Sequence, residues 1–416
     1  MTSPRTDRAS LRVNSGRLWT RLMEMAAIGA TPAGGVHRLT LTDEDREARD
    51  LFVRWCQEAG LDTSVDAFGN IFARRSGRDP DAPPVVAGSH LDSQPMGGKF
   101  DGPLGVLAAL EAVDTMNDHG IETRHPIDVV SWTNEEGSRF APAMIGSGVF
   151  SGEFDLDWAL AIEDASGATI GGELRRIGYA GSLPTGGRKL RAAFELHIEQ
   201  GPILESAGTT IGVVTGVQGA RWYDVRIEGE ATHAGPVPMR QRRDPVRGAA
   251  RILDRLFEIV REYDDDARLT VGDLRTVPGS RNTVPGRVEL TVDIRHPNDD
   301  ALTDLDQRFR AVVATETGDM DLTGQVKQIW HSPTVRFSDE CVNGVRDAAI
   351  RLGYSHIDVF SGAGHDSVYL QRVCPTGMIF IPCEGGVSHA ERENISREDT
   401  EAGANTLLQA VLDVAD

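Results

Sequence analysis

The chain is poor in cysteine, and its few cysteines are spread apart. The four cysteines among 416 residues, Cys56, Cys341, Cys374 and Cys383, form no CxxC pair. This pattern argues against a disulfide framework and against a zinc site built from thiolates. We therefore expect reduced thiols and a cytoplasmic protein.

Long apolar runs and positive charge are also scarce. No stretch approaches the roughly 20 apolar residues of a membrane-spanning helix, and residues 1–10 lack the apolar core of a secretory signal. Lysine and arginine number 43 against 63 aspartate and glutamate residues, a formal net charge of −20. We therefore expect neither nucleic acid nor a membrane as partner, whereas a small anionic substrate can still meet a local arginine.

Strands and helices alternate along most of the chain. Short apolar segments typical of buried strands cover residues 84–88, 127–133, 193–198 and 378–382. Residues 42–59 and 102–116 have the composition and end signals of helices. This alternation predicts an α/β fold in which helices cover a central, mostly parallel sheet. In such sheets ligands bind beyond the carboxyl ends of the strands.

The segment 212–327 follows a different pattern. Residues 222–229 and 287–295 alternate apolar and polar side chains, as strands with one exposed face do, and helices are expected from residue 245 and over 302–314. The chain is also long enough for two domains to be the default. We expect a layered catalytic domain from residues 1–211 and 328–416, with a small α+β domain inserted at 212–327.

Histidine and carboxylate side chains gather at the ends of the four apolar strands. They are His90, Asp101, Glu136, His197 and His389, with Glu135 beside Glu136. Considered singly, each has a more ordinary role, such as a hydrogen-bonded loop histidine or an acidic helix start. Because the strand ends converge at one edge of a sheet, the set predicts a site for two divalent ions that share a carboxylate.

Six segments resemble a known family. They are GSHLDSQPMGGKFDG (88–102), TNEEG (133–137), HIEQGP (197–202), THAGPVPM (232–239), PGSRNTVPG (278–286) and SGAGHD (361–366). In this order they resemble the M20 family of dinuclear metallohydrolases. Within it they are most similar to the amidohydrolase branch, which includes N-carbamoyl-L-amino acid hydrolases, yeast-type β-alanine synthases and allantoate amidohydrolases. The resemblance spans the chain from Asp66 to His389.

The resemblance implies two divalent metal ions per subunit, zinc or else manganese, cobalt or nickel. His90 and His197 would hold one ion, and Glu136 and His389 the other. Asp101 would bridge the two ions. These five ligands are the same residues that the strand ends are expected to bring together.

Three further residues acquire catalytic roles from the resemblance. Glu135 would be the general base, and Asp92 would orient the imidazole of His90. The inserted domain would be the dimerisation domain of a homodimer, and its His233 would reach the partner subunit's site to stabilise the developing oxyanion.

The same resemblance implies a set of substrate contacts. Asn282 and Arg295 would hold the substrate carboxylate as a pair, which suits the bidentate geometry of a guanidinium. Gln200 would contact the ureido group beside the metal ions. Gly364 and His365, in the glycine-rich loop, would close over the substrate.

The implied reaction is hydrolysis of a linear amide or ureido C–N bond. The first choice is an N-carbamoyl-L-amino acid or N-carbamoyl-β-alanine, giving the amino acid, CO2 and ammonia. Allantoate or another ureido acid comes second, and a dipeptidase or aminoacylase third. A catalytically silent binding protein on the same fold is disfavoured because all five ligands and the base are present, and no G-x-G-x-x-G loop between strand and helix supports a dinucleotide-binding oxidoreductase.

Overall fold

Four parallel strands form the centre of the largest sheet in the computed structural model, which describes residues 10–263 and 265–416. The sheet order is β1-β2-β4-β3-β5-β15-β6-β13, with β14 paired to β6. Strands β4, β3, β5 and β15 are parallel, whereas β2 and β6 join them in the antiparallel sense. The strands are β1 (Asp62–Val65), β2 (Ile71–Arg75), β3 (Val85–His90), β4 (Ile127–Trp132), β5 (Ala192–Ile198), β6 (Ile211–Val217), β13 (Val335–Arg336), β14 (His356–Ser361) and β15 (Thr376–Ile381).

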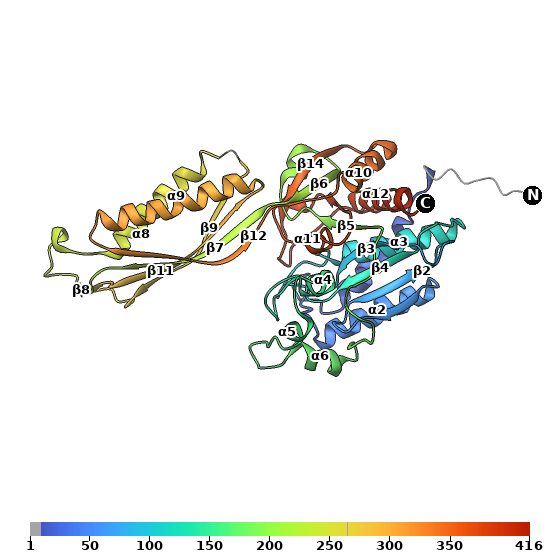
Figure 1. The fold of residues 1–416 in the computed structure, drawn as a ribbon, viewed down its shortest axis with the longest axis horizontal. Coiled ribbons are helices and arrows are strands. Elements are labelled where there is room, and N and C mark those ends of the chain that lie inside the picture. Colours follow the sequence, from blue (N-terminus) through green and yellow to red (C-terminus); the bar gives the residue numbers. More distant parts are fainter. Residues whose placement is uncertain (1–9, 264) are drawn as a thin grey trace, which may run out of the picture. The chain divides into compact units, whose positions relative to one another are not determined.

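Helices cover both faces of this sheet, which is why its central strands are apolar along their whole length (Figure 1). Val86 of β3 packs with Phe150 and Leu370 on one face. Ser89, which points to the other face, lies against Gly105 of α3. The helices are α1 (Ser15–Ala27), α2 (Asp43–Glu58), α3 (Pro103–Asp118), α4 (Ile145–Ser151), α5 (Leu156–Leu160), α6 (Ile170–Ile177), α7 (Ile203–Ala207), α10 (Asp339–Leu352), α11 (Ser367–Leu370) and α12 (Arg397–Ala415).

A second sheet is antiparallel, with the order β12-β7-β11-β9. Side chains on one of its faces, such as Tyr223 and Val288, pack with Ile252 and Phe309 of two helices into a separate core. The side chains between these point to the opposite, more exposed face of the sheet, which explains the period of two in the sequence. The elements are β7 (Gly219–Glu228), β8 (Thr232–His233), α8 (Pro245–Val260), β9 (Arg268–Val277), β10 (Thr283–Val284), β11 (Arg287–His296), α9 (Asp299–Gly318) and β12 (Thr323–Ser332).

The two cores define two units, one of residues 1–215 and 337–416 and one of residues 216–336. The predicted α/β fold with an inserted α+β unit is thus confirmed. These units divide at 215/216 and 336/337, a few residues beyond the expected 211/212 and 327/328, since β6 continues to Val217 and β12 continues to Ser332. Strands β9 and β12 were not anticipated from the sequence.

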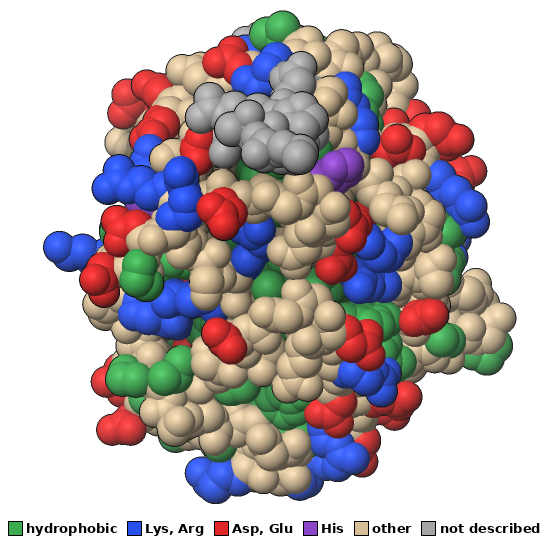
Figure 2. Space-filling model, turned by 90° about the vertical axis from the view of Figure 1, so that its right-hand side faces the viewer, with side chains coloured by type: hydrophobic (Ala, Val, Ile, Leu, Met, Phe, Trp, Pro, Cys, Tyr) green, Lys and Arg blue, Asp and Glu red, His purple; other side chains and the backbone are tan. Residues whose placement is uncertain are grey.

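The surface and the thiols agree with the composition. Acidic and basic side chains are interspersed over the face seen in Figure 2. All four cysteines are buried and unpaired. Among the described residues, no helix combines the length and the apolar character needed to span a bilayer.

The close fit of α3 on the sheet yields a first prediction. A Cβ at Gly105 would lie 2.4 Å from the carbonyl oxygen of Leu196 and 2.7 Å from Cβ of Ser89. Gly105→Ala is therefore expected to lower the free energy of unfolding by about 1–3 kcal/mol in urea denaturation. Gly344→Ala in α10 is the matched control, since nothing lies within 4 Å of its added Cβ. A Gly105→Ala protein as stable as this control would contradict the packing.

Candidate metal centre

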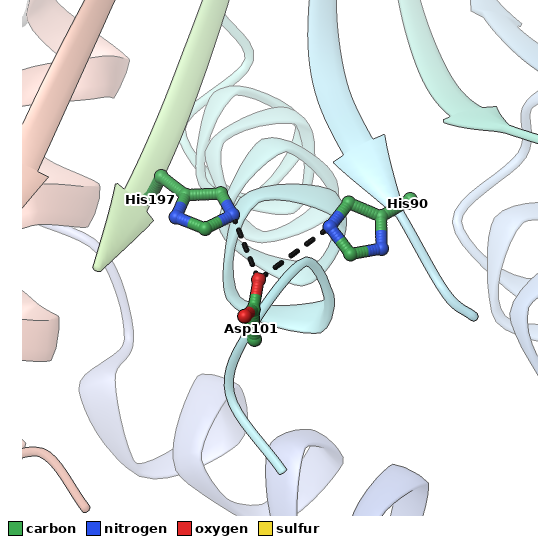
Figure 3. Close-up of side chains that lie close together, drawn as sticks. All are labelled: His90, Asp101 and His197. Atoms are coloured by element: carbon green, nitrogen blue, oxygen red, sulfur yellow. Dashed lines mark ion pairs between the residues drawn. The ribbon is translucent and has the colours of Figure 1, made fainter. Parts of the chain in front are cut away.

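Two imidazoles converge on one oxygen of Asp101. His90 is the last residue of β3, His197 lies near the end of β5, and Asp101 precedes α3 (Figure 3). The Nε2 atoms of His90 and His197 lie 3.6 and 3.1 Å from Oδ1 of Asp101. Both histidine side chains are 1% exposed. These three residues form the first donor group of the centre.

A second donor group meets the other oxygen of the same aspartate. His389 Nε2 lies 3.3 Å from Oδ2 of Asp101 and 3.4 Å from Oε2 of Glu136. Glu136 follows β4, and His389 follows the turn after β15. The His389 side chain is 49% exposed, and its backbone has a φ of 53°. Asp101 thus presents one carboxylate oxygen to each group.

The ring nitrogens of the first group are arranged for metal binding. Nδ1 of His90 lies 2.9 Å from the carbonyl oxygen of Asp92, and Nδ1 of His197 lies 2.9 Å from that of Ile198. Since a carbonyl only accepts, each Nδ1 carries a proton, and in the neutral ring the lone pair is on Nε2, facing Asp101. Imidazole with carboxylate is a donor set that fits zinc and its neighbours.

The electrostatics of the centre also call for cations. Four carboxylate side chains, those of Asp92, Asp101, Glu135 and Glu136, are each no more than 9% exposed. Burial raises the pKa of Glu136 to about 7, and Asp101 adds to the effect. Burial also raises the pKa of Glu135 well above its usual range, against the influence of His90. Two divalent cations would balance four such carboxylates.

The imidazoles respond to the same negative charge. Burial lowers the pKa of His90, but the carboxylates of Glu135 and Asp101 outweigh it and raise that pKa well above 6.5. The hydrogen bond to Asp101 raises the pKa of His389 to about 9. Protons and metal ions therefore compete for the same nitrogen atoms.

Asp92 contacts the His90 ring through its backbone rather than through its side chain. Its carboxylate lies 3.8 Å from Nδ1 of His90, and the atom that orients the ring is its backbone carbonyl. The carboxylate instead accepts N–H groups from Glu135 at 3.3 Å and Glu136 at 3.2 Å, and the hydroxyl of Thr40 at 2.6 Å. Asp92 thus holds the turn that carries the two glutamates. The position of Asp92, two residues after His90, does not show that backbone N–H groups compete for its carboxylate oxygens.

The two adjacent glutamates point to different donor groups. Oε2 of Glu135 lies 3.5 Å from Nε2 of His90, whereas Oε2 of Glu136 faces His389. Asn134 makes the turn possible with a φ of 61°, and its amide donates to the carbonyl oxygens of Phe140 and Pro142. Glu135 therefore lies beside the centre but belongs to neither of the two donor groups around Asp101.

Gln200 lies against the centre with one amide atom unused. Its Nε2 donates to Oδ2 of Asp101 at 2.8 Å and to the hydroxyl of Ser388 at 3.1 Å. Its Oε1 is buried and has no hydrogen-bond donor among the described residues. A buried acceptor without a donor is costly, so this oxygen is suited to an N–H group of a ligand.

His365 is packed below the centre. Its side chain is 2% exposed, its Nε2 lies 2.9 Å from the hydroxyl of Ser361, and its ring centroid is 4.5 Å from that of His197. Burial holds the pKa of His365 well below its usual range. Gly364 lies against the side chain of Met144. His365 is therefore a buried support for His197, whereas Gly364 in the same loop is exposed. That this loop closes over a substrate stays a prediction.

A third group, of Glu195, His197 and His365, has donor atoms close enough for a metal ion. The carboxylate of Glu195, however, already accepts the hydroxyls of Ser89 at 2.7 Å and Ser367 at 2.6 Å. Nε2 of His365 lies within hydrogen-bond distance of the Ser361 hydroxyl. We assign this group to support of the centre.

In the second unit, Asn282 directly precedes β10, whose first residue, Thr283, pairs with His233 of β8. The carbonyl oxygen of Asn282 accepts the N–H of Ala234 at 2.9 Å. The N–H of Gly235 donates to Nδ1 of His233 at 3.1 Å. Because Nδ1 accepts this hydrogen bond, the ring proton is on Nε2, which makes Nε2 a hydrogen-bond donor.

Arg295 lies at the opposite end of β11 from Asn282. The eight residue-to-residue steps from Arg287 to Arg295 span about 27 Å at 3.4 Å per step, and Asn282 comes before that strand begins. Nη2 and Nε of Arg295 lie 2.7 and 3.0 Å from Oδ2 of Asp293. Asn282 and Arg295 of one chain are therefore too far apart to bind the same carboxylate, and their pairing on a substrate stays a prediction.

Two residues that contact the ligands were missed from the sequence. The backbone N–H and Nε2 of Gln94 donate to the two oxygens of Glu136 at 3.0 and 2.7 Å. Glu393 binds the backbone of the loop that carries Asp101. Gln94 lies within the same segment as His90, which was a usable signal. Glu393 is 292 residues from Asp101, and nothing in the sequence joins them.

Comparisons with known proteins place this geometry in context. Residues 86–413 match the model of the peptidase family M20/M25/M40. An N-carbamoyl-L-amino-acid amidohydrolase of Rhizobium meliloti is 50% identical over 97% of each chain. An allantoate amidohydrolase of Bacillus subtilis is 34% identical over 94% of this chain and 95% of its own.

A solved structure is similar over almost the whole chain. It is an amidase of the hydantoinase/carbamoylase family from Burkholderia multivorans, 56% identical, with a TM-score of 0.95 over 98% of this chain and 99% of the other. The resemblance found in the motifs is thus confirmed. The family is one of metal-dependent hydrolases, in agreement with the donor groups around Asp101.

The shared aspartate gives a test of the centre. After chelation, titration with Zn²⁺ or Mn²⁺ in a calorimeter is expected to show two ions per chain. Asp101→Ala should lose both ions, because each group loses its common oxygen, whereas His389→Ala should keep the ion held by the buried histidines. His119→Ala, which changes an exposed histidine, should bind like the wild type. Retention of both ions by Asp101→Ala would refute the shared centre.

Proposed function

The chain belongs to the peptidase family M20/M25/M40, and on that premise we propose that it hydrolyses the ureido C–N bond of N-carbamoyl-L-amino acids. The observation that carries the proposal is the division of one carboxylate, that of Asp101, between two donor groups with Glu135 beside them. The relative from Rhizobium meliloti supports the choice of substrate.

Two divalent ions would be held by the ligands already described. His90 and His197 would bind one ion, Glu136 and His389 the other, and Asp101 both. When bound there, such ions lower the pKa of water towards neutrality and polarise a carbonyl group. Zinc is the first choice for the ion, with manganese, cobalt or nickel as alternatives.

The side chains around the ligands divide the remaining work. Oε2 of Glu135 takes a proton from the attacking water and delivers it to the departing nitrogen. The Nε2–H of His233 donates to the oxygen of the carbonyl as charge develops there. Oε1 of Gln200 accepts an N–H of the ureido group, which satisfies its lone pairs. Ammonia leaves, and the remaining carbamate loses CO2 to give the amino acid.

A carboxylate on the substrate would be bound by Arg295. Asp293 holds the guanidinium in place by two contacts with Oδ2. Because Asn282 and His233 lie at the other end of β11, they would reach the same substrate from a second copy of the chain. The proposal therefore includes a homodimer in which each site takes Arg295 from one subunit and His233 with Asn282 from the other.

A second candidate substrate is allantoate, because a relative from Bacillus subtilis carries the name allantoate amidohydrolase. Allantoate shares the ureido group and the carboxylate, so the same residues would bind it. A dipeptide ranks third, since it offers no ureido N–H for Gln200. A reducing location such as the cytoplasm suits four buried, unpaired thiols.

The reaction can be tested directly on the purified protein. After metal removal, Zn²⁺, Mn²⁺, Co²⁺ or Ni²⁺ is restored, and ammonia release is measured with N-carbamoyl-L- and D-amino acids, N-carbamoyl-β-alanine, allantoate and dipeptides. Metal-dependent turnover is expected, fastest with an N-carbamoyl-L-amino acid. Absence of turnover with the whole panel would overturn the proposal, and faster turnover of allantoate would favour the second candidate.

The base assignment has its own variant. Glu135→Gln is expected to bind both metal ions while kcat falls by about 10²-fold or more, because the amide cannot accept the proton. Metal content is measured beside kcat on the same preparation. If Glu135→Gln instead loses an ion, Glu135 is a ligand and the roles of the two glutamates are exchanged.

Sharing of sites across a dimer predicts complementation. Glu135→Gln and His233→Ala are each expected to be nearly inactive alone. When the two are co-expressed, random pairing gives mixed dimers in which one site keeps both residues, and about a quarter of the wild-type rate should return. Glu135→Gln co-expressed with itself is the control. Activity no higher than the sum of the separate variants would show that His233 acts within its own chain.

A further inference from the structure

We propose that Glu393 is a positioning residue for Asp101, and that through Asp101 it controls the binding of both metal ions. The inference rests on the proposed metal centre but concerns a residue outside the ligand set. Glu393 lies in the loop after His389, four residues beyond that ligand, and is 1% exposed. No ion pair with a lysine or arginine is recorded for it in the described part of the chain.

The carboxylate of Glu393 is occupied by the loop that ends at Asp101. Its Oε1 accepts the backbone N–H of Phe100 at 3.0 Å and that of Asp101 at 3.1 Å. Two successive N–H groups on one oxygen fix the direction in which the chain enters α3. Since the side chain of Asp101 leaves from the second of these residues, its orientation follows from the same contact.

The other oxygen of Glu393 reaches the side chain of Asp101 through a hydroxyl. Oε2 lies 3.1 Å from Oγ of Ser388, and that Oγ lies 3.0 Å from Oδ2 of Asp101. Oδ2 is the oxygen that faces His389. Glu393 therefore holds the backbone of Asp101 directly, and the single proton of the Ser388 hydroxyl lies between the two carboxylates, available to either.

Gly98 shows that the space for Glu393 is reserved. A Cβ placed on Gly98 would lie 1.9 Å from Cδ of Glu393 and 2.0 Å from each of its carboxylate oxygens. No left-handed φ requires a glycine at this position, so the lack of a side chain serves the close approach of the carboxylate. Gly98, which is part of the loop between His90 and Asp101, therefore packs directly against the carboxylate of Glu393.

Gln94 provides a natural comparison. It holds both oxygens of Glu136, which belongs to only one of the two donor groups. Asp101 belongs to both groups. A residue that positions Asp101 should therefore affect two ions, whereas a residue that positions Glu136 should affect one.

The experiment measures metal affinity rather than turnover. Calorimetric titration with Zn²⁺ is carried out on the wild type, Glu393→Ala, Glu393→Gln and Gln94→Ala, with Glu398→Ala as a control on an exposed glutamate. We expect Glu393→Ala to weaken both ions by about 10- to 100-fold, and Gln94→Ala to weaken one. Glu393→Gln should stay within a few-fold of the wild type, because its amide oxygen still accepts both N–H groups.

A double-mutant cycle adds a test of the geometry. Gly98→Ala should weaken both ions in the wild-type background by displacing the carboxylate, and should cost little more in the Glu393→Ala background, where the space is free. Additive losses would overturn the proposal. If Glu393→Ala does not fold, Gly98→Ala alone carries the test: weaker binding of both ions supports the proposal, and unchanged affinity overturns it.

The outcomes separate this inference from the proposed function. A wild type that binds no divalent ion refutes the metal centre itself. A wild type that binds two ions, with unchanged affinity in Glu393→Ala and Gly98→Ala, refutes the role of Glu393 and leaves the centre standing. Loss of a single ion in Glu393→Ala would also refute it, since positioning of Asp101 must act on both.

Discussion

The division of one carboxylate between two clusters of nitrogen and oxygen donors is the constraint on which the site depends. Oδ1 of Asp101 faces two fully buried histidines, and Oδ2 faces Glu136 and the half-exposed His389. Four buried carboxylates are costly unless cations compensate them, because burial removes the water that would otherwise stabilise the charge. The folded chain therefore concentrates negative charge at one position, where a bound cation is stabilised.

The surrounding structure holds the donor side chains in place. Strands β3 and β5 are parallel neighbours, so their carboxyl ends present His90 and His197 at the same edge. Asp92, Gln94 and Glu393 then bind the loops that carry the remaining ligands. The hydrogen bonds of these three residues keep the side chains of Glu136 and Asp101 directed at the centre. Rigidity in this layer keeps the donor atoms together before any ion arrives.

Much of the fold and the convergence of the proposed ligands could be predicted from the sequence, since both follow from local pattern. Apolar strands ending in histidine or glutamate place those residues at one sheet edge, and Thr42 caps α2 as its sequence indicated. Contacts between distant segments could not be predicted, as Glu393 shows. The roles of Asp92 also escaped, because competition among backbone N–H groups decides which of its atoms faces His90.

The choice of substrate depends on a different layer from the activation of water. Imidazole and carboxylate ligands around Asp101 suit hydrolysis of several carbonyl compounds alike, so they cannot by themselves separate a ureido acid from a peptide. In the proposed function, selection depends on Gln200, with its unused acceptor, and on Arg295 for the carboxylate. β11 separates Arg295 from Asn282 and His233 within one chain, which is why the proposed function brings the latter two from a second copy. On the proposed assignment, substrate binding and oxyanion stabilisation both need residues of a second copy, whereas the ligands of the metal centre all lie in one chain.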